Sequence, residues 1–322
     1  MSTLWLRSLD WMSRAAPGRE WFTGRYFGTI ENVAVLRPGG LGDLVVLTRA
    51  ALRLSIDIRQ ILWVVEQRNA PWAQYLNIPH LLYDRPTDFI ALLRGRRRFH
   101  VVLNSEQFHG LATLFAARLA RPGGKLIGFS SNPRADYFDE QIPYNPRALS
   151  AFDAFQALFA SAAGPLLRQG SFEMTPPRLS EAPGAPGRYR VVVLGGLQSA
   201  QRRLGIEDWV RIVSFAQRYR SDSLPVYLLG APADRAISEK IAVAAGGTTN
   251  LVGVLPFPRV IETIRCAGRV FGVDSGLLHV ADFFGVPTSA VYFSEEKRTE
   301  WPPQTSGSEM LSLADVLRAN DV

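Results

Sequence analysis

Residues 269–293 constrain the fold of this chain more than any other stretch. The apolar run 270–273 predicts a buried strand, and the apolar residues of 277–284 continue at helical spacing. Between them lies an Asp-Ser-Gly turn in which Ser275 is a favourable helix N-cap, and the Gly-Val-Pro sequence at 285–287 ends the helix. A second apolar run then follows as a strand. The stretch therefore predicts a strand–turn–helix–strand unit of an α/β protein.

The turn of this unit is a candidate site for an anion. The helix would begin at the edge where the strand ends, so its unpaired N–H groups and its dipole would favour a phosphate there. Ser275 and Gly276 are small enough for close approach, and His279 lies one turn into the helix, on the face that could reach an anion or a ribose. A plain turn and cap at Asp274 and Ser275, with His279 as a satisfied core residue, is the alternative. The serine stands one place too late for the Gly-x-Ser-x-Gly elbow of serine hydrolases.

The composition indicates a globular protein of two domains. The chain has 322 residues, enough for two hydrophobic cores, and it is 47% hydrophobic and 20% charged. Cys266 is its single cysteine, which excludes an intramolecular disulfide and a cysteine-rich metal site and favours a reducing compartment. No apolar run reaches the roughly 18 residues of a membrane span, and no continuous apolar signal core is recognised near the N-terminus.

The net charge is +7, and almost all of the cationic residues are arginines. Arginine binds phosphates and carboxylates through its planar guanidinium group, so a phosphorylated partner is expected. Nucleic acid, anionic lipid and a nucleotide-sugar all meet this description, and charge alone does not separate them. Residues 1–30 mix Trp, Phe and Leu with arginines. Such a composition is typical of an amphipathic segment at a membrane interface, and equally of aromatic side chains docked on the protein's own surface.

A glycine-rich turn follows the first clear strand, expected at 33–36. The turn, Arg-Pro-Gly-Gly-Leu-Gly-Asp at 37–43, leads into an apolar helical run at 44–54. A Rossmann-like unit begins in this way, but the glycines match neither the Gly-x-Gly-x-x-Gly fingerprint nor a Walker A loop. The turn would hold Asp43 at the start of the helix. There it would cap the helix or, beside a substrate hydroxyl, serve as a general base.

Further strands are expected at 61–66, 99–103 and 126–129, separated by segments of helix length. This alternation predicts a parallel, doubly wound sheet. The densest basic cluster of the chain lies in the same region and comprises Arg94, Arg96, Arg97 and Arg98. A run of this kind is usually a solvated face, but on the same domain as Asp43 it could bind an anionic acceptor.

A proline-rich stretch, residues 165–188, separates two halves of similar design. Beyond it a strand at 189–194 again leads into a glycine-rich turn, which begins at Gly195. Helices at 207–220, 233–245 and 258–267 and a strand at 226–229 complete the second half. We therefore expect an N-terminal segment 1–30, a domain 31–164, a linker 165–188 and a domain 189–322. Ligands of such sheets bind at the carboxyl ends of the strands, so two facing domains would form a cleft.

Three motifs, in this order, resemble glycosyltransferase family 9, the ADP-heptose:lipopolysaccharide heptosyltransferases. They are Gly-Leu-Gly-Asp-Leu-Val-Val-Leu-Thr-Arg-Ala-Ala-Leu ending at Leu52, Leu-Gly-Ala-Pro ending at Pro232, and Asp-Ser-Gly-Leu-Leu-His ending at His279 with its following Gly-Val-Pro. The resemblance covers residues 31–301. It implies an α/β GT-B fold of two Rossmann-like domains and an inverting transfer without metal ion or cofactor. The chain accordingly has no Asp-x-Asp motif.

The resemblance also implies roles for individual residues. Asp43 matches the general base that takes the proton of the acceptor hydroxyl, and Asp234 lies where a carboxylate contacts the nucleoside of the donor. The residues implied in donor binding are Gln198, Ser199, Arg202, Arg203, Asp234, Asp274, Ser275, Gly276 and His279. Those implied in acceptor binding are Gly40, Gly42, Arg94, Arg96 and Arg97. The implied partners are ADP-heptose and a Kdo/heptose–lipid A acceptor, at the cytoplasmic face of the inner membrane, with peripheral membrane contact and without nucleic acid.

The sequence departs from the family pattern in two places. Arg202 and Arg203 stand where the family has a lysine followed by Trp-Pro, and Phe-Ser-Glu at 293–295 replaces Gly-Pro-Thr. Besides a heptosyltransferase, two readings stay open: a family 9 transferase with another nucleotide-sugar or acceptor, and a non-catalytic relative that binds a nucleotide or a lipid. A GT-B epimerase has no feature of its own in this sequence.

Overall fold

The computed structural model describes residues 30–85, 98–162, 183–195 and 204–318. The chain divides into two compact units, Met1–Met174 and Thr175–Val322, which are called the N-terminal and the C-terminal unit below. Within the described residues each unit contains one six-stranded sheet in which all strand pairs are parallel. The expected α/β class with two Rossmann-like sheets is therefore confirmed. The division falls inside the proline-rich stretch 165–188, of which residues 165–182 lie outside the described part.

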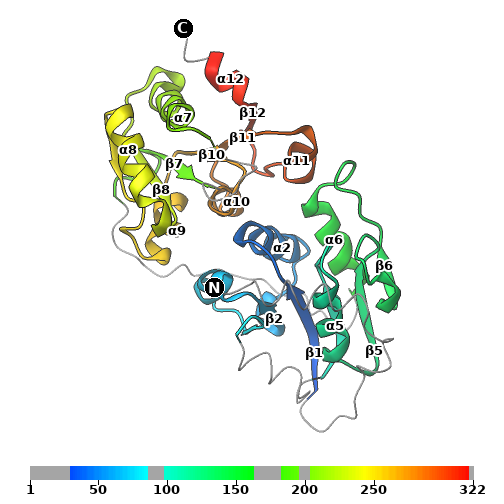
Figure 1. Cartoon of the computed structure of the whole chain (residues 1–322). Helices are drawn as coiled ribbons and strands as arrows, with labels where there is room; N and C mark the ends of the chain where they lie inside the picture. The colour runs from blue at the N-terminus through cyan, green and yellow to red at the C-terminus, as the bar shows by residue number, and fades with distance from the viewer. Residues whose placement is uncertain (1–29, 86–97, 163–182, 196–203, 319–322) are drawn as a thin grey trace. The chain divides into compact units, whose positions relative to one another are not determined.

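The elements of the N-terminal unit alternate along the chain. Its strands are β1 (Ile30–Arg37), β2 (Ile61–Val65), β3 (His80–Leu82), β4 (Arg98–Asn104), β5 (Ala120–Phe129) and β6 (Glu140–Ile142). Its α-helices are α2 (Leu41–Arg53), α3 (Ala70–Tyr75), α5 (Gly110–Leu119) and α6 (Ala151–Ser161). Helices α2 and α6 pack against each other on one face of the sheet, and α5 covers the other face (Figure 1).

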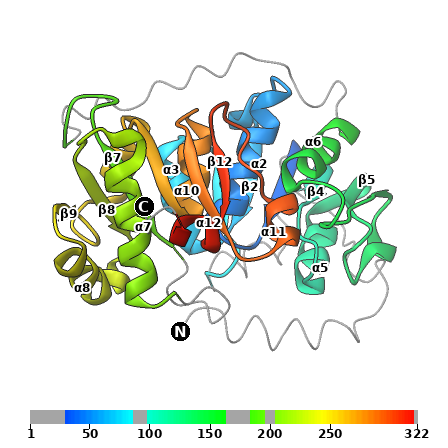
Figure 2. The ribbon, with the colours of Figure 1, turned by 90° about the horizontal axis from the view of Figure 1, so that it is seen from above.

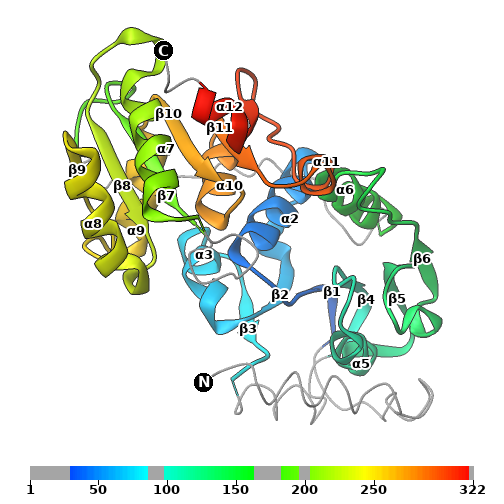
Figure 3. The same cartoon turned by 45° about the horizontal axis from the view of Figure 1, so that its top comes forward.

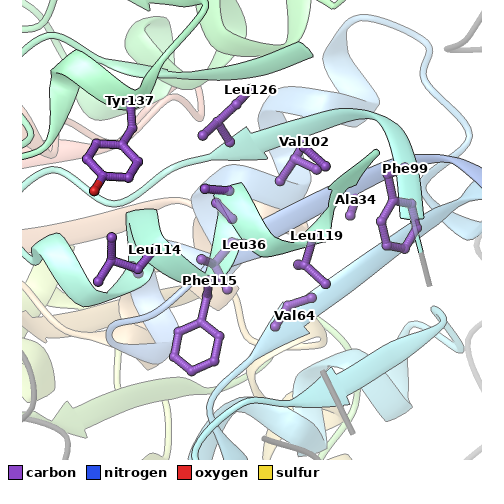
Figure 4. Packing of buried hydrophobic residues seen from close by; sticks show 14 of the residues in the cluster. Ala34, Leu36, Val64, Phe99, Val102, Leu114, Phe115, Leu119, Leu126 and Tyr137 are labelled. Atoms are coloured by element: carbon purple, nitrogen blue, oxygen red, sulfur yellow. The ribbon is translucent and has the colours of Figure 1, made fainter. Parts of the chain in front are cut away.

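The core between α5 and the sheet shows why these segments fold as they do. Leu114 and Phe115 of α5 belong to one buried cluster with Leu36, Val64 and Val102 of three adjacent strands (Figure 4). The strand residues are apolar on both faces because helices cover the sheet on both sides. Full burial of one such side chain stabilises the fold by about 1.5–3 kcal/mol. The continuous apolar runs of the sequence therefore become the central strands.

The C-terminal unit repeats this design. Its strands are β7 (Arg190–Leu194), β8 (Val226–Gly230), β9 (Thr248–Asn250), β10 (Arg269–Val273), β11 (Thr288–Tyr292) and β12 (Glu309–Ser312). Its α-helices are α7 (Ile206–Arg218), α8 (Arg235–Ala245), α9 (Phe257–Arg265), α10 (Gly276–Phe283), α11 (Glu295–Glu300) and α12 (Leu313–Arg318). Helix α7 packs beside α8 and α12 around the fully buried Trp209, while α9 and α10 pack together (Figures 2 and 3).

Both sheets have the same topology. The strand orders are β3-β2-β1-β4-β5-β6 and β9-β8-β7-β10-β11-β12. Counted within each unit, both follow 3-2-1-4-5-6, the order of dinucleotide-binding domains. The order reverses between the first and the fourth strand, and ligands of such sheets bind beside the carboxyl ends of these two strands. The places to search for a site are therefore the ends of β1 and β4 and the ends of β7 and β10.

The strands β3, β6, β9 and β12 were not expected from the sequence. All four are edge strands of three or four residues, so they pair on one side and lack a continuous apolar run. Strand β5 begins earlier than expected, because Ala120 already pairs with Phe99 of β4, and the Arg-Pro-Gly-Gly segment at 121–124 lies where the register shifts before Lys125 pairs with Val101. No helix in the described part of the chain combines the length and the apolar character of a membrane span.

Candidate active site

Two glycines bring the ends of β7 and β10 together in the C-terminal unit. A Cβ atom added to Gly195, directly after β7, would lie 2.1 Å from Ser275 Cβ and 2.4 Å from Ser275 Oγ. Gly272 in β10 has a φ angle of +154°, and a Cβ atom there would lie 2.5 Å from the carbonyl oxygen of Val193. Neither separation leaves room for a side chain. Gly195 therefore lies directly against Ser275, the residue that precedes α10.

Ser275 occupies the N-cap position of α10, as the sequence predicts, but its side chain does not cap the helix in the described structure. Its Oγ atom is buried and has no hydrogen-bond partner among the described residues. A buried hydroxyl without a partner costs about 1–3 kcal/mol. At the N-terminus of a helix, where the dipole favours negative charge, such a hydroxyl is suited to donate to an anionic oxygen. Gly276 follows as the first residue of α10.

His279 contacts Asp274 and is not at the surface of the turn. Its Nε2 atom lies 3.0 Å from Asp274 Oδ1, and both residues are buried. The ring centroid of Trp301 lies 5.5 Å from that of His279. In the described structure the imidazole therefore contacts the carboxylate of Asp274. The predicted contact of His279 with a bound anion or ribose stays a prediction.

Asp234 lies in the turn after β8, the neighbour of β7. It is buried, and its Oδ2 atom accepts a hydrogen bond of 3.3 Å from the backbone N–H of Ala231. Burial raises the pKa of this carboxyl group, and the bond from Ala231 opposes that shift. In the described structure Asp234 thus stabilises its own turn at the carboxyl edge of the sheet, after the strand that neighbours β7.

Asp43 lies at the carboxyl edge of the N-terminal sheet, in the first turn of α2. Its Oδ2 atom accepts a 2.7 Å hydrogen bond from the N–H of Gly40, the N-cap residue. Its Oδ1 atom lies 3.0 Å from a guanidinium nitrogen of Arg37, and the Asp43 side chain is 22% exposed. The cap is one of the two roles predicted for Asp43. Gly42 lies beside it in the first turn of α2.

Two charged residues beside Asp43 were not identified from the sequence. Arg37, the last residue of β1, donates a 2.5 Å hydrogen bond to the carbonyl of Ser105, directly after β4. Glu106 is buried, and its Oε1 atom accepts bonds from the N–H groups of residues 107 and 108. Burial raises the pKa of Glu106, Arg37 opposes this shift and Asp43 adds to it. The polar run Asn-Ser-Glu-Gln at 104–107, directly after an apolar strand, was the sequence signal for this edge.

Several predicted site residues lie outside the described residues. These are Gln198, Ser199, Arg202 and Arg203 of the donor set and Arg94, Arg96 and Arg97 of the acceptor set. The expected amphipathic segment 1–30 also lies outside, except for its last residue. The described part of the donor set comes together at the carboxyl edge of the C-terminal sheet, and Gly40, Gly42 and Asp43 come together at that of the N-terminal sheet.

Comparison with known proteins identifies a family for the C-terminal unit. The model of glycosyltransferase family 9 (heptosyltransferase) matches residues 173–317, which include β7, β10 and α10. The match covers most of the C-terminal unit and assigns that unit to glycosyltransferase family 9. A search of curated protein sequences gave no match to this chain.

Solved structures of family 9 proteins share its fold. A glycosyltransferase of Veillonella parvula has a TM-score of 0.66 at 13% identity, and the match covers 90% of this chain and 88% of that one. The E. coli heptosyltransferase WaaC with ADP has a TM-score of 0.64 at 16% identity, with 87% and 93% covered. E. coli ADP-heptose lps heptosyltransferase II has a TM-score of 0.61 at 15% identity, with 90% and 97% covered. At these identities the likeness is one of fold, and the fold shared with these structures is the GT-B fold.

Proposed function

We propose that this glycosyltransferase moves a heptose from ADP-heptose to a lipid-linked saccharide acceptor of the lipopolysaccharide inner core, with inversion and without a metal ion. The observation that carries the proposal is the buried hydroxyl of Ser275, which lies without a partner in the described residues at the N-terminus of α10. A diphosphate oxygen would complete its hydrogen bonding, and the helix dipole would favour that charge. The similar E. coli heptosyltransferase WaaC has been solved with ADP, which supports ADP as the nucleotide.

The proposed reaction is a single displacement. The acceptor hydroxyl oxygen forms a bond to the anomeric carbon of the donor sugar, the bond from that carbon to the diphosphate breaks, and ADP leaves. Asp43 takes the proton of the hydroxyl as general base. Negative charge develops on the diphosphate, so the Ser275 hydroxyl and the N–H groups at the start of α10 would lower the barrier there.

Binding of nucleotides tests the donor half of the proposal. Calorimetric titration with ADP, UDP and GDP in the absence of metal should show selective ADP binding. Ser275→Ala should weaken ADP binding roughly tenfold, since the change removes one charge-assisted hydrogen bond. Ser289→Ala is the matched control. The Ser289 hydroxyl lies at the start of β11, away from the carboxyl edge of the sheet, and bonds Arg269 and Glu309, so ADP affinity should be retained. Equal affinity for the three nucleotides, or no binding, would contradict an ADP-sugar donor.

The role of Asp43 is tested by turnover with ADP-heptose and a Kdo-lipid A acceptor. Asp43→Asn should lower kcat by roughly two orders of magnitude and retain ADP affinity, as expected for loss of a general base. Asp208→Asn provides the control for capping, because Asp208 accepts from the N–H of Gly205 at the start of α7 just as Asp43 does from Gly40 at α2. If both variants lost only stability, the cap alone would account for Asp43.

A panel of nucleotide-sugars separates the remaining alternatives. Strict preference for a donor other than ADP-heptose would replace the heptose assignment and keep the glycosyltransferase. Selective ADP binding without product from any donor and acceptor would favour a non-catalytic relative.

We further propose peripheral contact with the cytoplasmic face of the inner membrane, on the basis of the aromatic and arginine residues of the N-terminal segment.

A further inference from the structure

Arg37 is a buried arginine that links β1 to three other elements of the N-terminal unit. It ends β1, its Nη1 atom donates to the carbonyl of Ser105 after β4 at 2.5 Å, and another guanidinium nitrogen lies 3.0 Å from Asp43 Oδ1 on α2. The guanidinium also lies over the ring of Phe155 on α6, 5.5 Å from its centroid. The guanidinium is therefore held by a backbone carbonyl after β4, by a carboxylate of α2 and by an aromatic ring of α6.

The acceptor of this arginine is itself fixed. Ser105 bonds the carbonyl of Leu36, the residue before Arg37, both through its N–H at 3.1 Å and through its Oγ atom at 2.8 Å. The turn after β4 is therefore tied to the end of β1 by three hydrogen bonds, counting that of Arg37. A guanidinium held in this way has little freedom, so its position can define that of the carboxylate it faces.

The arrangement is asymmetric toward solvent. The Arg37 side chain is 7% exposed, whereas that of Asp43 is 22% exposed, so the carboxylate is the more accessible half of the pair. Oδ1 faces Arg37 and Oδ2 faces the N–H of Gly40, and each carboxylate oxygen can accept more than one hydrogen bond. The carboxylate can thus receive a substrate hydroxyl while its orientation is held from behind. Burying an arginine costs several kcal/mol that an apolar side chain would not, so stability alone does not account for it.

We infer that Arg37 is a positioning residue: it fixes the carboxylate of Asp43 for proton transfer from the acceptor hydroxyl. The inference rests on the role proposed above for Asp43. Arg37 acts through Asp43 and has no assigned contact with the substrate. Arg37 also balances the negative charge of Glu106, a second carboxylate that interacts electrostatically with both Arg37 and Asp43. His109 follows Glu106 in the turn after β4. Without Arg37, the repulsion between the charges of Asp43 and Glu106 would be less compensated.

The test is a double-mutant cycle on the full-length protein, measured as kcat and KM with ADP-heptose and a Kdo-lipid A acceptor. Arg37→Met should lower kcat roughly tenfold to a hundredfold, the loss expected when a catalytic group is misplaced by about 1 Å. KM for the donor and calorimetric ADP affinity should stay within about twofold, since Arg37 belongs to the N-terminal unit and the proposed donor residues to the C-terminal unit. Arg37→Lys keeps the charge without the fork and should recover part of the loss. Arg37→Met in the Asp43→Asn background should cause little further loss, because both act through one carboxylate.

Arg269→Met is the matched control for removal of a buried arginine. Arg269 starts β10, bonds the carbonyls of Thr288 and Gly307, and lies at the opposite edge of its own sheet from Ser275. It should lower the melting temperature and leave kcat of the folded protein unchanged. A kcat of Arg37→Met within threefold of wild type, or a loss that multiplies fully with that of Asp43→Asn, overturns the inference and leaves the proposed function standing. An Asp43→Asn variant as active as wild type, or a wild type inactive with this donor and acceptor, overturns both.

Discussion

The contact between Gly195 and Ser275 can be tested by adding a single methyl group. In Gly195→Ala the new Cβ would lie 2.1 Å from Ser275 Cβ, whereas carbon atoms in contact are about 3.5–4.0 Å apart. One of the two segments must therefore move by roughly 1.5 Å. The obstructing atom is a Cβ next to the backbone of the N-cap residue, so no side-chain rotation relieves the clash. Overpacking of this kind costs about 1–3 kcal/mol.

Two measurements follow from this clash. At about 2–4 °C for each kcal/mol, the melting temperature of Gly195→Ala should fall by roughly 2–12 °C in calorimetry. Calorimetric titration should show ADP binding weakened at least roughly tenfold, because displacement of Ser275 moves both its hydroxyl and the start of α10. The double change Gly195→Ala with Ser275→Gly removes the obstructing Cβ. It should regain most of the lost stability and remain weak for ADP, because the hydroxyl is absent.

Gly205→Ala is the control for a change from glycine to alanine. Gly205 is the N-cap of α7, and the nearest atom to an added Cβ, Asp208 Oδ2, lies at an ordinary 3.5 Å. This variant should keep both the melting temperature and the ADP affinity close to those of wild type. A Gly195→Ala variant that also matched wild type in both would refute the reasoning, since residue 195 would then not lie against Ser275.

Three further changes test the described packing and the N-terminal segment. Burial raises the pKa of Glu106 above its ordinary value of 4.5. As pH rises, the folded state therefore keeps a proton that the unfolded chain has already lost. The resulting contribution to stability is present at low pH and is lost as pH rises through the folded-state pKa. Glu106→Gln keeps an oxygen for the N–H groups of residues 107 and 108. It should therefore raise the free energy of unfolding at pH 7 and not at pH 4. Equal free energies of unfolding for the variant and the wild type at pH 7, measured by denaturation, would contradict this. Asp282→Ala should lower the free energy of unfolding by about 2–4 kcal/mol in urea denaturation, since it leaves the N–H groups of Gln304 and Thr305 without their carboxylate acceptor; Asp282→Asn, which keeps one acceptor oxygen, should lose less. Deletion of residues 1–28 should reduce cosedimentation with anionic vesicles more at low than at high salt, and unchanged sedimentation would exclude an interfacial role.

The sequence alone predicted the class of fold and its duplication. Central strands of parallel sheets are covered by helices on both faces, so β1, β4, β7 and β10 are continuous apolar runs that can be recognised locally. The turn at the start of α10 and the turn before α2 were also recognisable, because glycines and a capping residue occupy fixed positions within a few residues. The family resemblance depended on the same short segments.

Tertiary structure decided which of these residues meet. Arg37 and Ser105 are 68 positions apart, and Gly195 is distant in sequence from Ser275, so no local pattern could pair them. His279 likewise lies 5.5 Å from the ring of Trp301, which follows β11, and local spacing could not place these two rings together. The edge strands were invisible for a related reason: hydrogen bonds to one neighbouring strand create them, whereas their own side chains form no apolar run. Central strands, caps and turns depend on residues within a few positions of each other, so the sequence shows them. The order of the strands determines which side chains share one edge of a sheet, and that order belongs to the tertiary structure.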